Sequence, residues 1–403
     1  MSSWPRVKLG EVCLSIVDGD HQSMPISDTG IPFITISDIK DNRIDFSGAR
    51  FVSVEYYTAL DDTRKPSEGS VLYSVKGSFG IPVYVDSEKP FTFQRDIAIM
   101  KCKTELNPRY LYYILKSQEY YKIADSLAIG SAQRALTLKT LRNLEIPFPD
   151  NKTQQQIVNY LSSYDSLIET NQRQILLLEE AAQRLYKEWF INLRYPGHEN
   201  VPVVDGVPEG WERKTMADVC QAIGGGTPST AKKEYYEGGT IRWVTPTDLT
   251  RTGSWILLDT EKKITKEGLD NSSAKMLPPY TVLMTSRASI GYIALCKHEV
   301  CTNQGFISCV PFDEKVRYYL MFNLLNRVDE IKSKATGSTF LEITKRTFKE
   351  LEIIKPPEET ISSFNTVIIP MINRMELLFQ QTELLSTARD RLLPKLMSGE
   401  IAV

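Results

Sequence analysis

The chain has 403 residues, of which 42% are hydrophobic and 24% are charged. This mixture is ordinary for globular proteins, and it excludes a disordered chain, a collagen and a small disulfide-bonded scaffold. At roughly 150 residues per domain, the length predicts two or three domains. Because the formal net charge is only −2, any surface for nucleic acid must be a local patch rather than a global excess of cations.

The N-terminal segment and the hydropathy of the chain argue against membrane insertion and secretion. No apolar run approaches the ~20 residues that cross a bilayer. The N-terminus carries Arg6 and Lys8 but lacks the apolar core of a secretory signal. We therefore expect a cytoplasmic protein without a membrane partner, with its cysteines as reduced thiols.

A small group of cysteine and histidine residues invites comparison with zinc sites. The group consists of Cys296, His298, Cys301 and Cys309. Its spacing matches no common zinc pattern. Alternating apolar residues around it predict strands, in which small buried thiols are common. We therefore expect buried thiols here and no metal site.

The sequence repeats itself. Residues 4–13 align with 211–220, and residues 144–146 align with 351–353, both at an offset of 207. The central parts match poorly, and their loops fit at an offset of 211 instead. Shared ends with divergent middles predict one scaffold that was duplicated and then given a different surface in each copy.

Each half ends in a long helical segment. Thr153 to Phe190 contains no proline or glycine, and its apolar positions alternate at spacings of four and three residues. This pattern is typical of a coiled-coil seam, on which Asn171 would fix the register. Pro370 and Pro394 lie in the second segment, where we expect local bends or frayed turns. The predicted seam residues are Ile157, Leu161, Ile168, Asn171, Ile175, Leu178 and Leu185 in the first segment, and Phe364, Ile368, Met375, Leu378, Leu385 and Leu392 in the second.

These observations predict an α+β protein with a pseudo-two-fold internal repeat. Two mixed globular domains are separated by two long helices that pair with each other in antiparallel fashion. The joint between the halves is rich in proline and glycine and is expected to be extended. The predicted parts are a first globular domain at 1–150, a first long helix at 151–191, a linker at 192–209, a second globular domain at 210–356 and a second long helix at 357–403.

Catalytic motifs are mostly absent. The sequence has no P-loop, no H-E-x-x-H and no G-x-S-x-G. Leu277-Pro-Pro-Tyr280 resembles the Asn-Pro-Pro-Tyr motif of amino-methyltransferases, but leucine replaces the polar first residue and a turn before a strand is favoured. Pro202, Asp205, Glu212 and Lys214 mimic a nuclease motif, but they span the linker rather than a sheet. We therefore expect no catalytic residues.

Several segments resemble a known family. Residues 223–229 (Ile-Gly-Gly-Gly-Thr-Pro-Ser) and 235–245 are similar to the opening of a target recognition domain. Residues 185–190, with Val207-Pro-Glu-Gly-Trp211, resemble the central conserved region of the same family, and 392–401 resemble its C-terminal end. The family is the specificity subunit (HsdS) of type I restriction–modification systems. In the first half, Asp18-Gly-Asp-His21 replaces the Gly-Thr-Pro-Ser motif.

The resemblance implies a non-catalytic DNA reader without a cofactor of its own. Each target recognition domain would read one half of a bipartite, asymmetric site in double-stranded DNA, and the paired helices would hold the two readers apart. Two methyltransferase (M) subunits carrying S-adenosylmethionine would dock and methylate adenines. A motor nuclease (R) subunit would add restriction. The alternatives are a coiled-coil scaffold that binds only proteins, and a single-chain DNA-modifying enzyme.

Candidate DNA contacts come from loops that align between the halves and from the family motif. Small residues around one cation suit close approach to a phosphate backbone, and Arg, Asn and Gln suit base edges. Trp243, within the motif, is expected in the core. The candidate DNA-binding residues are Lys76, Ser78, Gln94, Arg95, Gln133, Arg134, Thr227, Arg242, Thr245, Arg287, Ser289, Asn303, Gln304 and Ser338.

Overall fold

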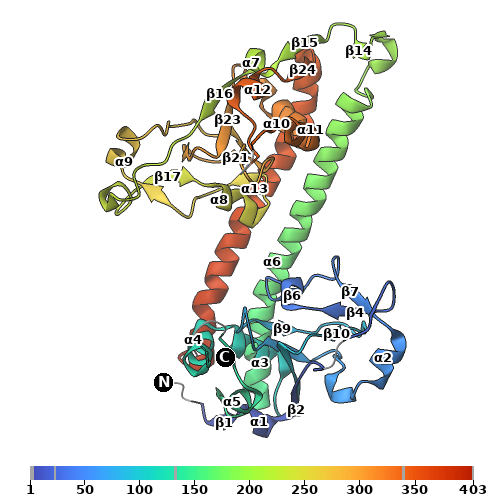
Figure 1. Cartoon of the computed structure of the whole chain (residues 1–403), viewed down its shortest axis with the longest axis vertical. Helices are drawn as coiled ribbons and strands as arrows, with labels where there is room; N and C mark the ends of the chain where they lie inside the picture. The colour runs from blue at the N-terminus through green and yellow to red at the C-terminus, as the bar shows by residue number, and fades with distance from the viewer. Residues whose placement is uncertain (1–3, 22–23, 131–133, 338–340, 402–403) are drawn as a thin grey trace. The chain divides into compact units, whose positions relative to one another are not determined.

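The computed structural model divides the chain into two compact units (Figure 1). Unit 1 comprises Met1–Glu169 and Thr382–Val403, and unit 2 comprises Thr170–Gln381. Each unit therefore contains one globular part and one stretch of each long helix. No helix in the described part of the chain is both long and apolar enough to cross a membrane. The described residues are 4–21, 24–130, 134–337 and 341–401.

Unit 1 is built on a sheet with the strand order β2-β11-β8-β9, and a smaller sheet with the order β10-β4-β7-β3 lies against it. Strand β1 pairs with β12, and β5 pairs with β6. The strands are β1 (Arg6–Lys8), β2 (Cys13–Asp18), β3 (Ile26–Ser27), β4 (Ile31–Ile34), β5 (Ile39–Lys40), β6 (Arg43–Ile44), β7 (Arg50–Val52), β8 (Val71–Ser74), β9 (Pro82–Tyr84), β10 (Thr92–Phe93), β11 (Ile97–Cys102) and β12 (Glu145–Pro147). The helices of its globular part are α1 (Leu9–Val12), α2 (Val54–Ala59), α3 (Pro108–Lys116), α4 (Gln118–Leu127) and α5 (Leu138–Arg142).

Unit 2 repeats this plan with the strand orders β16-β23-β20-β21-β18, β19-β17-β22 and β15-β24. Its strands are β15 (Glu212–Thr215), β16 (Cys220–Gly224), β17 (Ile241–Val244), β18 (Ile256–Leu257), β19 (Lys263–Ile264), β20 (Val282–Thr285), β21 (Ile293–Cys296), β22 (Cys301–Thr302), β23 (Phe306–Pro311) and β24 (Glu352–Lys355). The helices of its globular part are α7 (Met216–Val219), α8 (Pro246–Thr252), α9 (Lys266–Asp270), α10 (Arg317–Asn326), α11 (Val328–Ser333) and α12 (Lys345–Lys349).

The strand registers confirm the internal repeat. Arg6 lies opposite Pro147 in unit 1, and Arg213 lies opposite Ile354 in unit 2, each residue displaced by 207. The central strands are equivalent too: Val71 of β8 lies opposite Met100 of β11, and Val282 of β20 lies opposite Cys309 of β23. The α+β class and the internal repeat predicted from the sequence are therefore correct.

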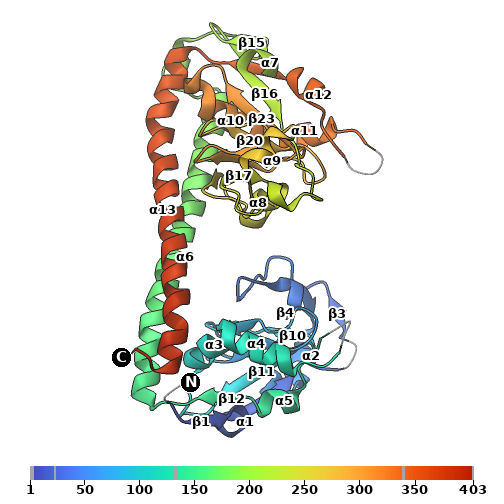
Figure 2. The ribbon, with the colours of Figure 1, turned by 90° about the vertical axis from the view of Figure 1, so that its left-hand side faces the viewer.

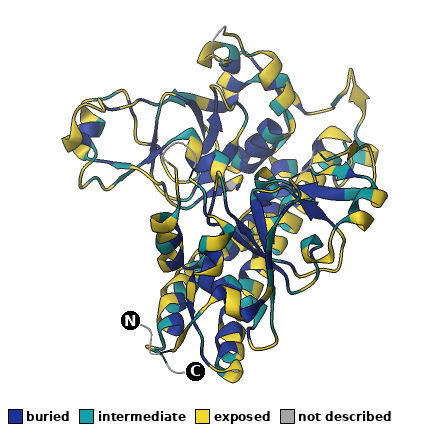
Figure 3. Ribbon diagram, turned by 60° about the horizontal axis from the view of Figure 1, so that its bottom comes forward, coloured by how far each residue is buried: buried dark blue, intermediate teal, exposed yellow. Residues whose placement is uncertain are grey.

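The central strands are buried on both faces. Val71, Leu72 and Tyr73 of β8 are all fully buried. Val71 and Tyr73 belong to a core shared with α3 and the long helices, whereas Leu72 belongs to a second core shared with the smaller sheet. In β20, Val282 and Leu283 divide in the same way. Such strands are continuous apolar runs because neither face meets water, and Figure 3 shows central strands in the colour of buried residues.

The long helices are α6 (Asn151–Tyr186), continued by the π-helical turn η3 (Lys187–Ile191), and α13 (Glu358–Ser398). In unit 1, Ile157 and Leu161 share a core with Leu393 and Leu396. In unit 2, the end of α6 packs instead against the start of α13, with α10 between the long helices and the sheet (Figure 2). The predicted antiparallel pairing is therefore confirmed.

Burial follows the predicted seam over most of its length. The buried seam residues are Ile157, Leu161, Ile168, Asn171, Ile175, Phe364, Ile368, Met375 and Leu378, and the half-buried ones are Leu178, Leu185, Leu385 and Leu392. Towards the end of α6, the buried positions become Ala182, Tyr186 and Phe190. A nearly straight helix drifts away from a strict seven-residue repeat, so the inner face moves by one residue there. Helix α13 continues past Pro370 and Pro394 without a break.

A charged cluster ties α3, α6 and α13 together in unit 1. An oxygen of the Asp165 carboxylate lies 2.6 Å from Nη1 of Arg389 and 3.6 Å from Nζ of Lys116, and the second oxygen accepts a 2.7 Å hydrogen bond from the Tyr113 hydroxyl. The residues 207 positions away from Asp165 and Arg389 are Ile372 and Ala182, and both are buried in the apolar core of unit 2. The equivalent position between the two long helices is therefore charged in unit 1 and apolar in unit 2.

The linker differs from the expected extended segment. Val203–Val204 (β13) and Val207–Pro208 (β14) form a hairpin, with Asp205 and Gly206 in the left-handed region at φ 50° and 74°. An Asp-Gly pair between two apolar runs favours such a turn. Tyr195 is buried against Trp211, with their ring centroids 5.2 Å apart. The linker is thus partly packed onto unit 2 rather than extended.

The Asp165 cluster predicts a pH-dependent contribution to stability. Burial opposes ionisation of Asp165, but Lys116, Arg389 and Tyr113 outweigh it and keep the pKa of the carboxyl below its usual value. We expect Arg389→Ala to lower the free energy of unfolding by about 1 to 2 kcal/mol at neutral pH, since the two side chains are only partly exposed.

A group with a lowered folded-state pKa stabilises above its unfolded pKa, about 3.9 for Asp, and this contribution is lost as the pH falls further. Denaturant unfolding should therefore show that the difference in the free energy of unfolding between wild type and Arg389→Ala is smaller at pH 3 than at pH 7. Arg184→Ala, which removes an exposed pair within α6, is the control and should change little at either pH. A difference in the free energy of unfolding that does not vary with pH would contradict the assigned role of Asp165.

Candidate nucleic-acid interface

Loops of unit 1 that the sequence analysis singled out converge at one edge of the β2-β11-β8-β9 sheet. Ser74 pairs with Ile97, and Ala98 pairs with Asp18. The end of β8, the beginning of β11 and the end of β2 therefore lie side by side. Lys76 and Ser78 follow β8. Gln94 and Arg95, which precede β11, are thus brought to the same edge, as are the residues that follow β2.

A third candidate loop folds onto this edge. Lys76 forms a β-bridge with Ala135, and the amide of Leu136 donates a 2.8 Å hydrogen bond to the Val75 carbonyl oxygen. Arg134 is directed to α4, where it is ion-paired with Asp125 and donates a 2.9 Å hydrogen bond to the carbonyl oxygen of the same residue. Gln133 and Ser338 lie outside the described residues.

Unit 2 presents the same loop cluster. Arg287 forms a β-bridge with Glu342, as Lys76 does with Ala135 in unit 1. The amide of Ala288 donates a 3.0 Å hydrogen bond to the Leu341 carbonyl oxygen. The pairing of Thr285 with Phe306 brings Asn303 and Gln304, just before β23, to the same edge. The alignment of loops made from the sequence therefore corresponds to equivalent positions in space.

The tip of the loop after the central strand has the same backbone form in both units. Gly77 has φ 74°, and Ala288, at the matching position, has φ 59°. Alanine rarely adopts this conformation, so the turn is maintained there against the residue's own preference. Arg287 and Ser289 on either side are exposed, and Nε of Arg287 lies 3.8 Å from a carboxylate oxygen of Glu342. The loop therefore displays a cation among small side chains.

The glycine-rich motif serves close packing of the backbone. A Cβ on Gly225 would lie 2.1 Å from the carbonyl oxygen of Thr302, and one on Gly226 would lie 2.2 Å from Oγ of Ser273. Gly19 in unit 1 makes the same kind of approach, because its Cβ would lie 2.4 Å from the Phe93 carbonyl oxygen. The segment Asp18–His21 therefore keeps the glycine that the fold requires, although its other residues depart from the motif. The sequence alignment alone missed this role.

Other motif residues are held by local contacts. Thr245 caps α8: its hydroxyl donates a 2.8 Å hydrogen bond to Asp248, and its amide donates one of 2.7 Å to the same carboxylate. Nε of Arg242 donates a 2.8 Å hydrogen bond to Asp259. Trp243 is buried, as expected, and its indole donates a 3.0 Å hydrogen bond to the Gly226 carbonyl oxygen. Direct DNA contact by Thr245 and Arg242 stays a prediction.

Thr227, Asn303 and Gln304 lie together beside this motif. The Thr227 hydroxyl donates a hydrogen bond to the Gln304 side-chain oxygen. The Asn303 side-chain oxygen accepts a 2.9 Å hydrogen bond from the Gly305 amide. Thr227 and Gln304 are exposed and Asn303 is half-buried. The three residues therefore form one polar surface at the loop edge, built by β-strand ends that are distant in sequence.

The loop edge of unit 1 also contains residues that sequence reasoning did not select. A hollow of about 410 Å³ opens there. In it, Asp20 accepts a 3.0 Å hydrogen bond from the Tyr56 hydroxyl, and the Arg50 guanidinium lies 5.5 Å from the ring centre of Phe33. No local pattern signals Arg50, because it comes from β7 in the smaller sheet. The lining residues are Asp20, His21, Met24, Ile26, Phe33, Arg50, Gln94 and Arg95.

The cysteine group is dispersed in the core. Cys296 and Cys301 are buried, and burial raises the pKa of their thiols to about 11 and about 12, respectively. Sγ of Cys301 donates a hydrogen bond to the Arg242 carbonyl oxygen at 3.4 Å. Cys309 lies beside Cys220, which together with burial raises the pKa of its thiol. Among the described residues, no group of three or more His, Cys, Asp or Glu side chains is arranged to hold a metal ion.

The backbone of β10 approaches Gly19 so closely that a methyl group at this position should destabilise the fold. Gly19→Ala should lower the free energy of unfolding by about 1 to 3 kcal/mol, because β10 must move to relieve overpacking. Gly48→Ala is the matched control, since a Cβ at Gly48 meets no heavy atom within 4 Å. Thermal and denaturant unfolding of both variants tests this expectation, and equal stabilities would contradict it.

Comparisons with known proteins agree with this geometry. The family model described as "Type I restriction modification DNA specificity domain" matches residues 1–180 and 208–376. The chain is similar to the HindI specificity subunit of Haemophilus influenzae, with 25% identity over 474 aligned positions that cover 100% of both proteins. It is 37% identical to the MjaIX specificity subunit of Methanocaldococcus jannaschii over 181 residues, which are 44% of this chain and only 42% of that protein.

A solved structure shows the same fold. The crystal structure of a type I restriction–modification S subunit from M. genitalium superimposes with a TM-score of 0.61 at 16% sequence identity, and the match covers 98% of this chain and 96% of that one. The family model matches most of the chain, once in each half. The chain therefore belongs to the type I restriction–modification DNA specificity family.

Proposed function

We propose that the chain is the non-catalytic DNA-reading subunit of a type I restriction–modification complex, and that each globular part reads one half of a bipartite, asymmetric site. The observation that carries this proposal is the duplicated loop cluster. Lys76 and Arg287 occupy equivalent positions on equivalent loops, yet the side chains around them differ. One scaffold with two different reading surfaces suits a site with two different halves.

The chemistry of these loops suits contact with duplex DNA. Lys and Arg at loop tips neutralise phosphates, and neighbouring Gln and Asn side chains suit the donor and acceptor pattern of base edges. Gln94 with Arg95 in unit 1 corresponds to Asn303 with Gln304 in unit 2. We assign phosphate contact to Lys76 and Arg287, and base contact to these two pairs. The complex would act in the cytoplasm, where it meets the DNA.

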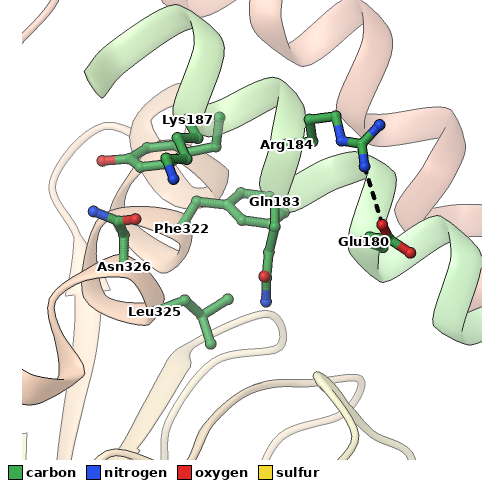
Figure 4. A pocket seen from close by; sticks show the side chains of 8 residues that line it. Glu180, Gln183, Arg184, Lys187, Phe322, Leu325 and Asn326 are labelled. Atoms are coloured by element: carbon green, nitrogen blue, oxygen red, sulfur yellow. Dashed lines mark hydrogen bonds and ion pairs between the residues drawn. The ribbon is translucent and has the colours of Figure 1, made fainter. Parts of the chain in front are cut away.

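Membership in the family supports the partners that we propose. We propose two methyltransferase subunits, which carry S-adenosylmethionine and methylate adenines, and a motor nuclease subunit for cleavage. Two equivalent hollows support two copies of one partner. In unit 2, Gln183 and Lys187 of the α6 segment line a hollow of about 400 Å³ against α10 (Figure 4). In unit 1, the residues 207 positions later, Asp390 and Pro394, line a hollow against α4.

The alternatives account for less of the structure. A scaffold that binds only proteins leaves the duplicated cationic loops without a role. A single-chain modifying enzyme would require a cofactor-binding or catalytic site of its own. Binding of S-adenosylmethionine by the isolated chain would favour that enzyme.

Methylome sequencing tests the function directly. A host expressing this chain with its methyltransferase is compared with a strain that lacks the chain. We expect a bipartite adenine motif with a fixed gap to be methylated only when the chain is present. If a confirmed, expressed complex methylates no such motif, the proposed function is wrong.

Substitutions at the loop tips test the assigned contacts. Lys76→Ala and Arg287→Ala should each weaken binding of a duplex that carries the motif by about tenfold, or about 1.4 kcal/mol. Each should also reduce the dependence of affinity on salt by about one phosphate equivalent. Arg184→Ala, an exposed cation on α6, is the control. Unchanged affinity in both loop variants, with folding intact, would contradict the assignment.

A further inference from the structure

The Pro278-Pro279-Tyr280 turn holds a tyrosine in an unusual conformation. The turn precedes β20, and the Thr281 hydroxyl closes it with a 2.7 Å hydrogen bond to the Pro278 carbonyl oxygen. Tyr280 has φ 59°, in the left-handed region that side-chain-bearing residues avoid. Such strain persists only where surrounding contacts impose it, and it often marks a functional position.

The contacts of Tyr280 lead from the turn to α13. The Tyr280 hydroxyl accepts a 3.0 Å hydrogen bond from Nζ of Lys297, and Lys297 forms an ion pair with Glu376 on α13. Lys297 and Arg317 also lie 5.4 Å and 5.5 Å from the centre of the tyrosine ring. The Glu376 side chain is only 10% exposed and that of Lys297 27%. These charges are thus largely withdrawn from water and depend on each other.

Unit 1 has an ion pair at the same position of its long helix. The residue 207 positions before Glu376 is Glu169 of α6. Its carboxylate pairs with Arg43 of the β5–β6 hairpin at 3.0 Å, but both side chains are more than half exposed, so this pair contributes little. The hairpin turn again contains left-handed residues, Asp41 and Asn42. Lys297 instead follows β21, so the two cations come from different parts of their globular domains.

The globular part of unit 2 packs against α13 over several helical turns, and Glu376 lies at one end of this contact. In unit 2, Phe364 of α13 packs against Phe322 of α10, with their ring centroids 6.1 Å apart. Glu376 lies 12 residues further along α13, or about 18 Å at ~1.5 Å per residue. The apolar contact between α13 and the globular part runs from Ile361 to Met375, and the ion pair of Glu376 with Lys297 lies at its end.

We propose that Glu376, with Lys297 and Tyr280, is a positioning residue that sets the angle of the second recognition domain on the long helices. That angle would select the number of unread base pairs between the half-sites. This inference rests on the proposed function. It assigns a role to the Leu-Pro-Pro-Tyr turn, which resembled a methyltransferase motif.

The test measures gap selectivity in the assembled methyltransferase complex. Duplexes carry both half-sites, taken from methylome sequencing, with the native gap or a gap one base pair shorter or longer. We expect Glu376→Gln to raise methylation at the altered gaps, relative to the native gap, about fivefold, which corresponds to about 1 kcal/mol. Glu400→Gln, which removes the exposed ion pair with Lys395 near the end of α13, is the matched control.

The readouts separate the possible failures. Unchanged gap selectivity of a folded Glu376→Gln complex would overturn the inference, and so would equal loss of methylation at every gap length with DNA binding retained. If that variant does not fold, Tyr280→Phe, which removes only the hydroxyl, carries the test with the same expected broadening. Absence of any bipartite methylation by the wild-type complex would instead contradict the proposed function.

Discussion

The packing of α6 against α13 is the constraint on which the rest of the structure depends. Each long helix buries apolar side chains against the other. Phe364, Ile368 and Met375 of α13 are fully buried in a core that also contains Tyr186 of α6. Each such side chain contributes roughly 1.5 to 3 kcal/mol relative to exposure. The same cores include residues of the globular parts, so the helix pair and the recognition domains are stabilised together rather than as separate modules.

The loop edge illustrates how this scaffold tolerates change. The hydrogen bonds that join the loops after β8 and β20 to the rest of the edge are made by the backbone. Side chains at the loop tips are therefore free to differ while the loops keep their form. The fold instead requires glycine at positions such as Gly19 and Gly225, where neighbouring backbone lies too close for any side chain. The form of these segments thus depends on residues other than the loop-tip side chains to which we assign DNA contact.

Much of the fold could be predicted from the sequence because periodicity and repetition are local signals. The heptad seam, the offset repeat and the alignment of loops around Lys76 and Arg287 all correspond to the structure. The Val203–Pro208 hairpin had a local signal that was overlooked. The Asp165–Arg389 contact and the role of Gly19 could not be predicted, since they depend on which distant segments meet. The ion pair of Arg134 with Asp125 likewise could not be predicted from the spacing of the two residues.

The exchange of a charged cluster in unit 1 for an apolar one in unit 2 makes the two long helices non-interchangeable. If α13 lay against a second copy of itself in the same register, Arg389 would face Ile372 and lose the carboxylate of Asp165. A guanidinium that is only 14% exposed is unfavourable without its partner. The duplicated halves have thus diverged so that each long helix matches the other better than it would match a copy of itself.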